Sequence, residues 1–114
     1  MGGFIHNSGV PMICCGEPLT ELVPNTVEAS VEKHLPVVTV SDGNIAIQIG
    51  SAPHPMGSDH HIAFVCVETQ RGGLFKHLAV DEEPKASFAV HSDDKPAAVY
   101  AFCNLHGLWK TAIK

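Results

Sequence analysis

Residues 35–50 read LPVVTVSDGNIAIQIG and contain the clearest structural signal in the chain. Asp42 and Gly43 form a dipeptide that is typical of a tight β-hairpin turn. After this turn, isoleucine occupies every second position over residues 45–49, as expected for a strand with one buried face. The stretch therefore predicts a hairpin of two antiparallel strands, over residues 35–41 and 44–50.

The remainder of the chain continues this pattern of short apolar runs separated by turn residues. Residues 71–73, RGG, and residues 93–96, DDKP, mark two of the turns. The further expected strands cover residues 62–68, 74–80, 86–91, 97–103 and 108–113. About seven short strands at this spacing predict an all-β protein with an immunoglobulin-like, antiparallel β-sandwich.

Upstream of the hairpin, only residues 26–33 are predicted to be helical. Asn25 or Thr26 is a suitable N-cap, and Glu28 lies in the expected first turn. The helix is short, and we expect it to cover one end of the sheet. Residues 1–13 are rich in Gly with Ser, Asn and Pro, which indicates a loosely packed extension. We therefore expect an N-terminal arm over residues 1–24 and one folded domain over residues 25–114.

Composition excludes several classes of function. The chain has 114 residues, of which 45% are hydrophobic and 17% are charged, and its net charge is −5. This length suits one hydrophobic core, and no apolar run is long enough to span a membrane. The shortage of Lys and Arg argues against nucleic-acid binding. The first residues have no basic start followed by an apolar stretch, so we expect a cytoplasmic location.

Histidine and cysteine are the most informative residue types, because eight histidines and four cysteines occur in this short chain. Histidine is the commonest metal-binding side chain. In a reducing cytoplasm, thiols are more often metal ligands or buried groups than disulfides. A single loop histidine is usually a solvated or hydrogen-bonded residue, so the arrangement of several matters. The histidines at expected strand ends or in loops are His34, His54, His60, His61 and His106.

Residues 103–106, CNLH, form the most informative local motif. A Cys-x-x-His turn can direct a thiolate and an imidazole at one metal ion, while backbone N–H groups of the turn hydrogen-bond the sulfur. The motif is only moderately specific by itself. It occurs together with residues 32–36, EKHLP, and with residues 54–60, HPMGSDH, in which the second histidine follows six positions after the first.

In this order and spacing, the three motifs closely resemble those of the superoxide reductase family, which comprises the neelaredoxins and the catalytic domains of desulfoferrodoxins. The resemblance runs from about Cys14 to Lys110. It implies one-electron reduction of superoxide to hydrogen peroxide at one mononuclear non-haem iron per chain, as a defence against oxidative stress. The implied ligands are four imidazoles in one plane and one axial thiolate, from His34, His54, His60, His106 and Cys103.

The resemblance also implies roles for the two residues before the first ligand. Glu32 is expected to occupy the sixth coordination position when the iron is ferric, and Lys33 is expected to lie above that open position in the ferrous state. Rubredoxin or a similar small electron carrier is the implied reductant. The implied assembly is a homodimer or a homotetramer.

The sequence departs from the family pattern in two places. His61 stands where the family often has Tyr, so two adjacent imidazoles compete for one ligand position; strand alternation sends them to opposite faces, and spacing favours His60. Residues 14–19, CCGEPL, resemble the closing half of a desulforedoxin-like iron module whose opening Cys-x-x-Cys half is absent. Two thiols do not complete a four-sulfur site. We therefore predict that Cys14 and Cys15 are a remnant with inert or partly exposed thiols, with a site shared between chains as the alternative.

The remaining candidates have simpler interpretations. We expect Cys66 to be a small buried core thiol, and His77 and His91 to be surface or structural groups. Met56 is interpreted as a loop-packing residue. Trp109 is expected to pack in the core, and it could also shield one side of the metal.

Two rival functions follow from the same residues. A cupredoxin-like electron carrier also combines a β-sandwich with His and Cys ligands. However, no Met follows His106 at the usual axial spacing, and four histidines exceed the need of a His₂Cys copper site. A binding module with structural zinc would have a closed tetrahedral site, which leaves Glu32 and Lys33 unexplained.

Overall fold

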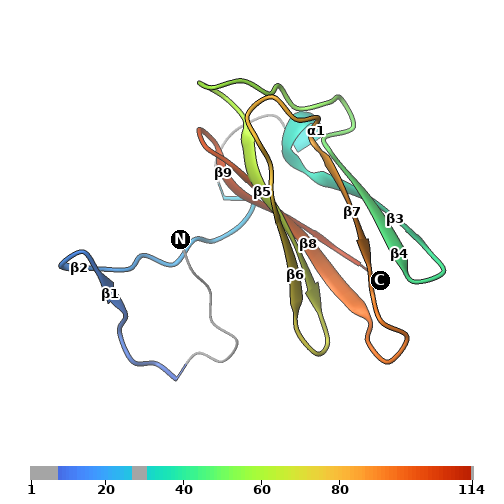
Figure 1. Ribbon diagram of the computed structural model, residues 1–114. Helices are drawn as coiled ribbons and strands as arrows, with labels where there is room; N and C mark the ends of the chain where they lie inside the picture. Colours follow the sequence, from blue (N-terminus) through green and yellow to red (C-terminus); the bar gives the residue numbers. More distant parts are fainter. Residues whose placement is uncertain (1–7, 27–30, 114) are drawn as a thin grey trace.

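The computed structural model describes residues 8–26 and 31–113. Its main body is a sandwich of two antiparallel sheets, one with the strand order β3-β4-β7 and one with the order β6-β5-β8-β9 (Figure 1). The predicted all-β sandwich is therefore confirmed. The strands are β3 (Pro36–Ser41), β4 (Asn44–Ile49), β5 (Ile62–Thr69), β6 (Gly73–His77), β7 (Lys85–Ala89), β8 (Pro96–Cys103) and β9 (Gly107–Ala112).

The hairpin that joins β3 to β4 has the predicted geometry. Asp42 and Gly43 have φ angles of 48° and 82°, so both lie in the left-handed region that a type I′ turn requires. On β4, buried isoleucines alternate with exposed residues. The strand therefore presents one apolar face to the second sheet, as the sequence pattern predicts.

The core lies between the two sheets. Strands β5 and β8 pair in the middle of the four-stranded sheet and supply much of its apolar surface. Full burial of each large aliphatic side chain stabilises the fold by about 1.5–3 kcal/mol, which gives a rigid scaffold for the groups at its end. The buried cluster consists of Ile45, Ile47, Ile49, Ile62, Val65, Val67, Leu78, Ala86, Val99, Ala101 and Cys103.

The strand predicted over residues 74–80 is too long at its C-terminal end, because β6 ends at His77. Leu78 then turns into the core and donates its backbone N–H to Ala63 O at 2.9 Å. After it, the Ala79 N–H donates to the Glu82 carboxylate and the Glu82 N–H donates to Ala79 O. This local turn ends the strand, and an apolar pattern alone does not reveal it.

The helical segment is described only in part. α1 covers Val31–His34, and the Leu35 N–H donates to Val31 O at 3.0 Å. Residues 27–30 lie outside the described part, so the predicted helix start and its N-cap stay predictions. Asn25 itself extends the edge of β9: its side-chain amide exchanges two hydrogen bonds with the backbone of Lys110.

The described part of the N-terminal arm forms a small hairpin of β1 (Ile13–Cys14) and β2 (Glu17–Pro18). All of its strand residues are exposed, and it stands away from the sandwich (Figure 1). The division of the chain into residues 1–24 and 25–114 stays a prediction. Among the described residues, no helix has the length and apolar character needed to cross a membrane.

Candidate metal centre

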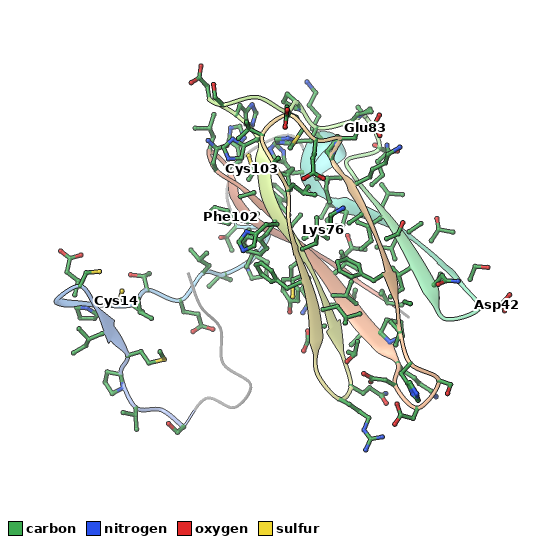
Figure 2. The ribbon with its side chains drawn as sticks, in the orientation of Figure 1. Cys14, Asp42, Lys76, Glu83, Phe102 and Cys103 are labelled. Carbon is green, nitrogen blue, oxygen red and sulfur yellow. The ribbon has the colours of Figure 1, made fainter. Side chains whose placement is uncertain are left out.

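A cluster of histidine and cysteine side chains lies at the end of the sandwich where β8 finishes and β5 begins. His34 comes from the end of α1, His54 and His60 from the loop before β5, and Cys103 from the end of β8. Their potential ligand atoms all lie within 4.8 Å of one another. The first two histidines and the cysteine are buried, and His60 is half-buried. Figure 2 labels Cys103 at this end of the sandwich.

His106 joins this cluster from the turn between β8 and β9. Its Nδ1 lies 3.0 Å from His34 Nε2 and 3.8 Å from Cys103 Sγ. Its ring centroid lies 5.1 Å from that of His60. The structure thus brings together all five side chains that the sequence analysis named as ligands.

Gly50 allows the end of α1 to approach the loop that carries His54. Its φ angle is 84°, and a Cβ at this position would lie 2.6 Å from Lys33 O. The Gly50 N–H donates to Leu35 O, and the His54 N–H donates to Ile49 O. A left-handed residue without a side chain is therefore required where His34 and His54 come together.

Trp109 supports the cluster from β9. Its indole stacks on the His34 ring with a centroid distance of 4.9 Å and an interplanar angle of 21°. Its Nε1–H donates to His106 O at 3.1 Å. Trp109 is almost fully buried, so it both packs in the sandwich and fixes two histidine segments.

Two of the imidazoles, His54 and His60, are suited to metal binding because burial favours their neutral form. Desolvation lowers the pKa of His54 from 6.5 to about 4, and it also lowers the pKa of His60, with a further contribution from neighbouring His106. His54 Nδ1 lies 2.7 Å from Pro55 O, which places its proton on Nδ1 and leaves Nε2 with a free lone pair.

Buried nitrogen atoms in this cluster also lack protein partners. His54 Nε2 and His60 Nε2 are fully buried and have no hydrogen-bond partner among the described residues. Unpaired buried polar atoms are costly, and an absent ion is one explanation for them. A set of imidazoles with one thiolate is a suitable donor set for a transition metal such as iron. The residues present therefore fit a metal ion.

The His61 ring makes a contact outside the cluster that contains His60. Its ring Nδ1 lies 2.9 Å from Gly57 O, and it is not among the clustered ligand atoms. Lys33 is exposed and directly precedes His34. The side chain of Glu32 lies outside the described part of the structure.

The other candidates lie outside this cluster. Cys66 is half-buried, so the prediction of a core thiol is wrong: Val65 and Val67 face the core, and alternation turns the residue between them to the opposite face. Burial raises the pKa of this thiol. His77 and His91 are exposed, as predicted.

Met56 matches its prediction as a loop-packing residue, while the N-terminal cysteines match theirs only in being exposed. Met56 packs against the core, and its Sδ accepts a hydrogen bond from Ile62 N at 3.3 Å. Cys14 and Cys15 are both exposed.

Comparison with known proteins gives consistent results. The desulfoferrodoxin family matches residues 26–112. The desulfoferrodoxin of Syntrophotalea carbinolica is 35% identical over 107 residues, which cover 94% of this chain and 83% of that protein. The superoxide reductase of Pyrococcus horikoshii is 31% identical over 104 residues, which cover 73% of this chain and 87% of that protein.

Solved structures resemble the chain in the same way. The crystal structure of the superoxide reductase from Treponema pallidum has a TM-score of 0.86 and 40% identity, covering 96% of this chain and 90% of that chain. The superoxide reductase (1Fe-SOR) from Giardia intestinalis has a TM-score of 0.58 and 30% identity, covering 73% of this chain and 98% of that chain. The chain therefore belongs to the desulfoferrodoxin family, which includes superoxide reductases.

Proposed function

We propose that this protein reduces superoxide to hydrogen peroxide at a mononuclear non-haem iron. The observation that carries the proposal is the convergence of four imidazoles and one thiolate at one end of the sandwich. We assign the ligands as His34, His54, His60, His106 and Cys103. Bound iron would supply one-electron exchange between its ferrous and ferric states. The overall reaction takes up one electron and two protons for each superoxide.

The charges of these ligands favour an anionic substrate. Neutral imidazoles leave the charge of a ferrous ion unchanged, and the Cys103 thiolate reduces it by one, so the centre keeps a net positive charge. Lys33 adds a second positive charge close by in sequence, on the exposed side of α1. A local positive field attracts a small anion even though the protein as a whole is acidic.

Cys103 and Glu32 would act after the substrate has arrived. The buried Cys103 thiolate would hold the metal and donate electron density to it, which would favour release of the reduced product. Solvent at the open side provides the protons. The Glu32 carboxylate would close the open position once the iron is oxidised, because a hard oxygen donor prefers the more highly charged ion.

The reaction requires an external reductant, since each superoxide removes one electron from the centre. The proposed donor is rubredoxin or a similar small electron carrier. We also propose that the protein acts in defence against oxidative stress, in the cytoplasm, as a homodimer or homotetramer. These statements rest on the family resemblance.

The decisive experiment is metal analysis with visible absorption and electron paramagnetic resonance, on protein isolated without added metal. Iron with a thiolate charge-transfer band supports the proposal. Strong blue copper absorption or a colourless zinc protein contradicts it. With an electron donor present, a reductase forms one hydrogen peroxide per superoxide, whereas a dismutase forms one per two, so product counting separates the two activities.

A further inference from the structure

The turn of the N-terminal hairpin has an unusual residue choice. Cys15 and Gly16 occupy the two central positions, with φ angles of 55° and 80°. Asn, Asp and Gly are the residues favoured in such a turn, and a left-handed conformation costs a residue such as Cys roughly 1–2 kcal/mol. The requirements of the turn therefore do not explain a cysteine at this position.

The left-handed conformation places two thiols together. Neighbouring side chains of an extended strand point to opposite faces, but here Cys14 Sγ and Cys15 Sγ lie 3.3 Å apart. Both side chains are exposed. In Figure 2, Cys14 lies on the outlying arm, well away from Cys103. The pair is thus an accessible dithiol that is separate from the iron ligands.

We propose that Cys14 and Cys15 form a chelating site for trivalent, thiol-binding metalloid compounds such as those of arsenic(III). A tetrahedral metal with bonds of about 2.3 Å to sulfur holds two sulfurs about 3.8 Å apart and needs four ligands. A three-coordinate pyramidal centre has narrower angles, so it holds two sulfurs closer together. When the metalloid already carries one substituent, two sulfurs complete its three bonds. Cys14 and Cys15 of a single chain can supply both sulfurs.

The chemistry is a condensation without oxidation or reduction. With phenylarsine oxide, each thiol loses its proton and forms one sulfur–arsenic bond. The arsenic–oxygen bond breaks, and the oxygen leaves with the two protons as water. No other reactant is required.

The test titrates the full, iron-loaded protein with phenylarsine oxide and follows the adduct by mass spectrometry under native conditions. We expect one adduct per chain, its loss in both Cys14→Ser and Cys15→Ser, and its retention in the control Cys66→Ser. The visible spectrum of the iron centre should not change. Absence of an adduct, its persistence in either arm variant, or bleaching of the iron spectrum would overturn the proposal.

A second inference concerns Asn104 and rests on a separate set of hydrogen bonds. Its side-chain Oδ1 accepts from the His61 N–H at 2.9 Å, and its Nδ2–H donates to Asp59 O at 2.9 Å. Its backbone N–H donates to His61 O at 3.2 Å. These partners lie on either side of His60, so one residue next to Cys103 holds the segment that carries another proposed ligand.

We infer that Asn104 is a positioning residue that fixes His60 relative to Cys103. The inference rests on the proposed metal centre, but it does not depend on which substrate that centre reduces. Groups that orient metal ligands typically change metal affinity by about 10- to 100-fold when they are removed. Asn104→Ala removes both side-chain hydrogen bonds, whereas Asn104→Asp keeps the acceptor for His61 N and loses the donor to Asp59 O.

Competition with an iron chelator measures the effect, and electron paramagnetic resonance reports the ligand geometry. We expect about 10-fold or greater loss of iron affinity and a heterogeneous ferric signal in Asn104→Ala, with a smaller loss in Asn104→Asp. Leu105→Ala, at the exposed neighbour in the same turn, is the matched control and should resemble the wild type. Wild-type affinity and signal in both Asn104 variants would refute this role. A lack of superoxide turnover in the wild type would instead refute the proposed function and leave these readouts intact.

Discussion

Cysteines occur in two contrasting surroundings in this chain. Cys103 has 0% exposure and lies among buried imidazoles at the end of a rigid core, while Cys14 and Cys15 are exposed on a small hairpin. Among the described residues, the only group of three or more potential ligands is the one around Cys103. Enclosure by the sandwich, more than the thiol itself, therefore prepares a cysteine for metal binding.

The strongest test of this contrast is Cys103→Ser. We expect loss of the thiolate-to-iron charge-transfer band and of most of the reductase activity, because oxygen is a harder donor than sulfur and gives less electron density. Visible spectroscopy and superoxide consumption measure the change. The control Cys66→Ser should keep both, and an unchanged spectrum in Cys103→Ser would exclude this cysteine as the ligand.

Acid should lower the stability of the metal-free protein through the histidines of the enclosed region. The pKa of His54 is about 4 in the folded protein against an ordinary value of 6.5, and the pKa of His60 is also lowered. Between these values the unfolded chain binds more protons than the folded chain, so stability falls as the pH decreases from about 6.5 toward 4. Urea unfolding of the metal-free protein measures this loss.

His54→Gln should flatten this pH dependence, and simultaneous replacement of Cys14 and Cys15 by Ser should leave it as in the wild type. Equal pH dependence in the wild type and His54→Gln would show that this imidazole is not the source.

Lys33→Ala tests the exposed side of the cluster. Its charge is proposed to lie within a Debye length, about 8–10 Å, of the open position. We expect the second-order reaction of the ferrous protein with superoxide to slow severalfold and to depend less on salt, with iron content intact. Pulse radiolysis measures the rate. Lys95→Ala is the matched control, because Lys95 precedes β8 at the end of that strand opposite to Cys103. Equal rates in the two variants would refute steering by Lys33.

Glu32→Ala should have a smaller effect on the encounter, because the carboxylate is proposed to bind only after oxidation. The ferric visible spectrum and its pH dependence should change, while the rate with superoxide stays close to that of the wild type. A ferric spectrum identical to that of the wild type would exclude Glu32 as the sixth ligand.

The smallest effect is expected in the arm. Replacement of both Cys14 and Cys15 by Ser should leave about one iron per chain and nearly full activity, because two thiols do not complete a four-sulfur site. Metal analysis and visible spectroscopy test this. Loss of a rubredoxin-like spectral component would show that the arm holds iron, as in a site shared between two chains, and would remove the contrast with Cys103.

Local sequence by itself determined most of the strands of the sandwich. The Asp42-Gly43 turn and the isoleucine alternation of β4 depend only on backbone conformation and side-chain period, which neighbouring residues decide. The order of the three motifs also pointed to the family and to a set of site residues. No single motif was sufficient, because each contributes only one or two ligands.

Tertiary structure decided how these residues meet. Strand pairing brings Ile62 opposite Cys103 and so places the loop of His60 beside the Cys103–His106 turn, while the His61 ring contacts Gly57 O. The hydrogen bonds of Asn104 and the outward direction of Cys66 likewise depend on contacts between distant segments. A sequence pattern shows the side-chain period of a strand, but it does not show which strand pairs with it. The paired strand determines which groups each side chain contacts.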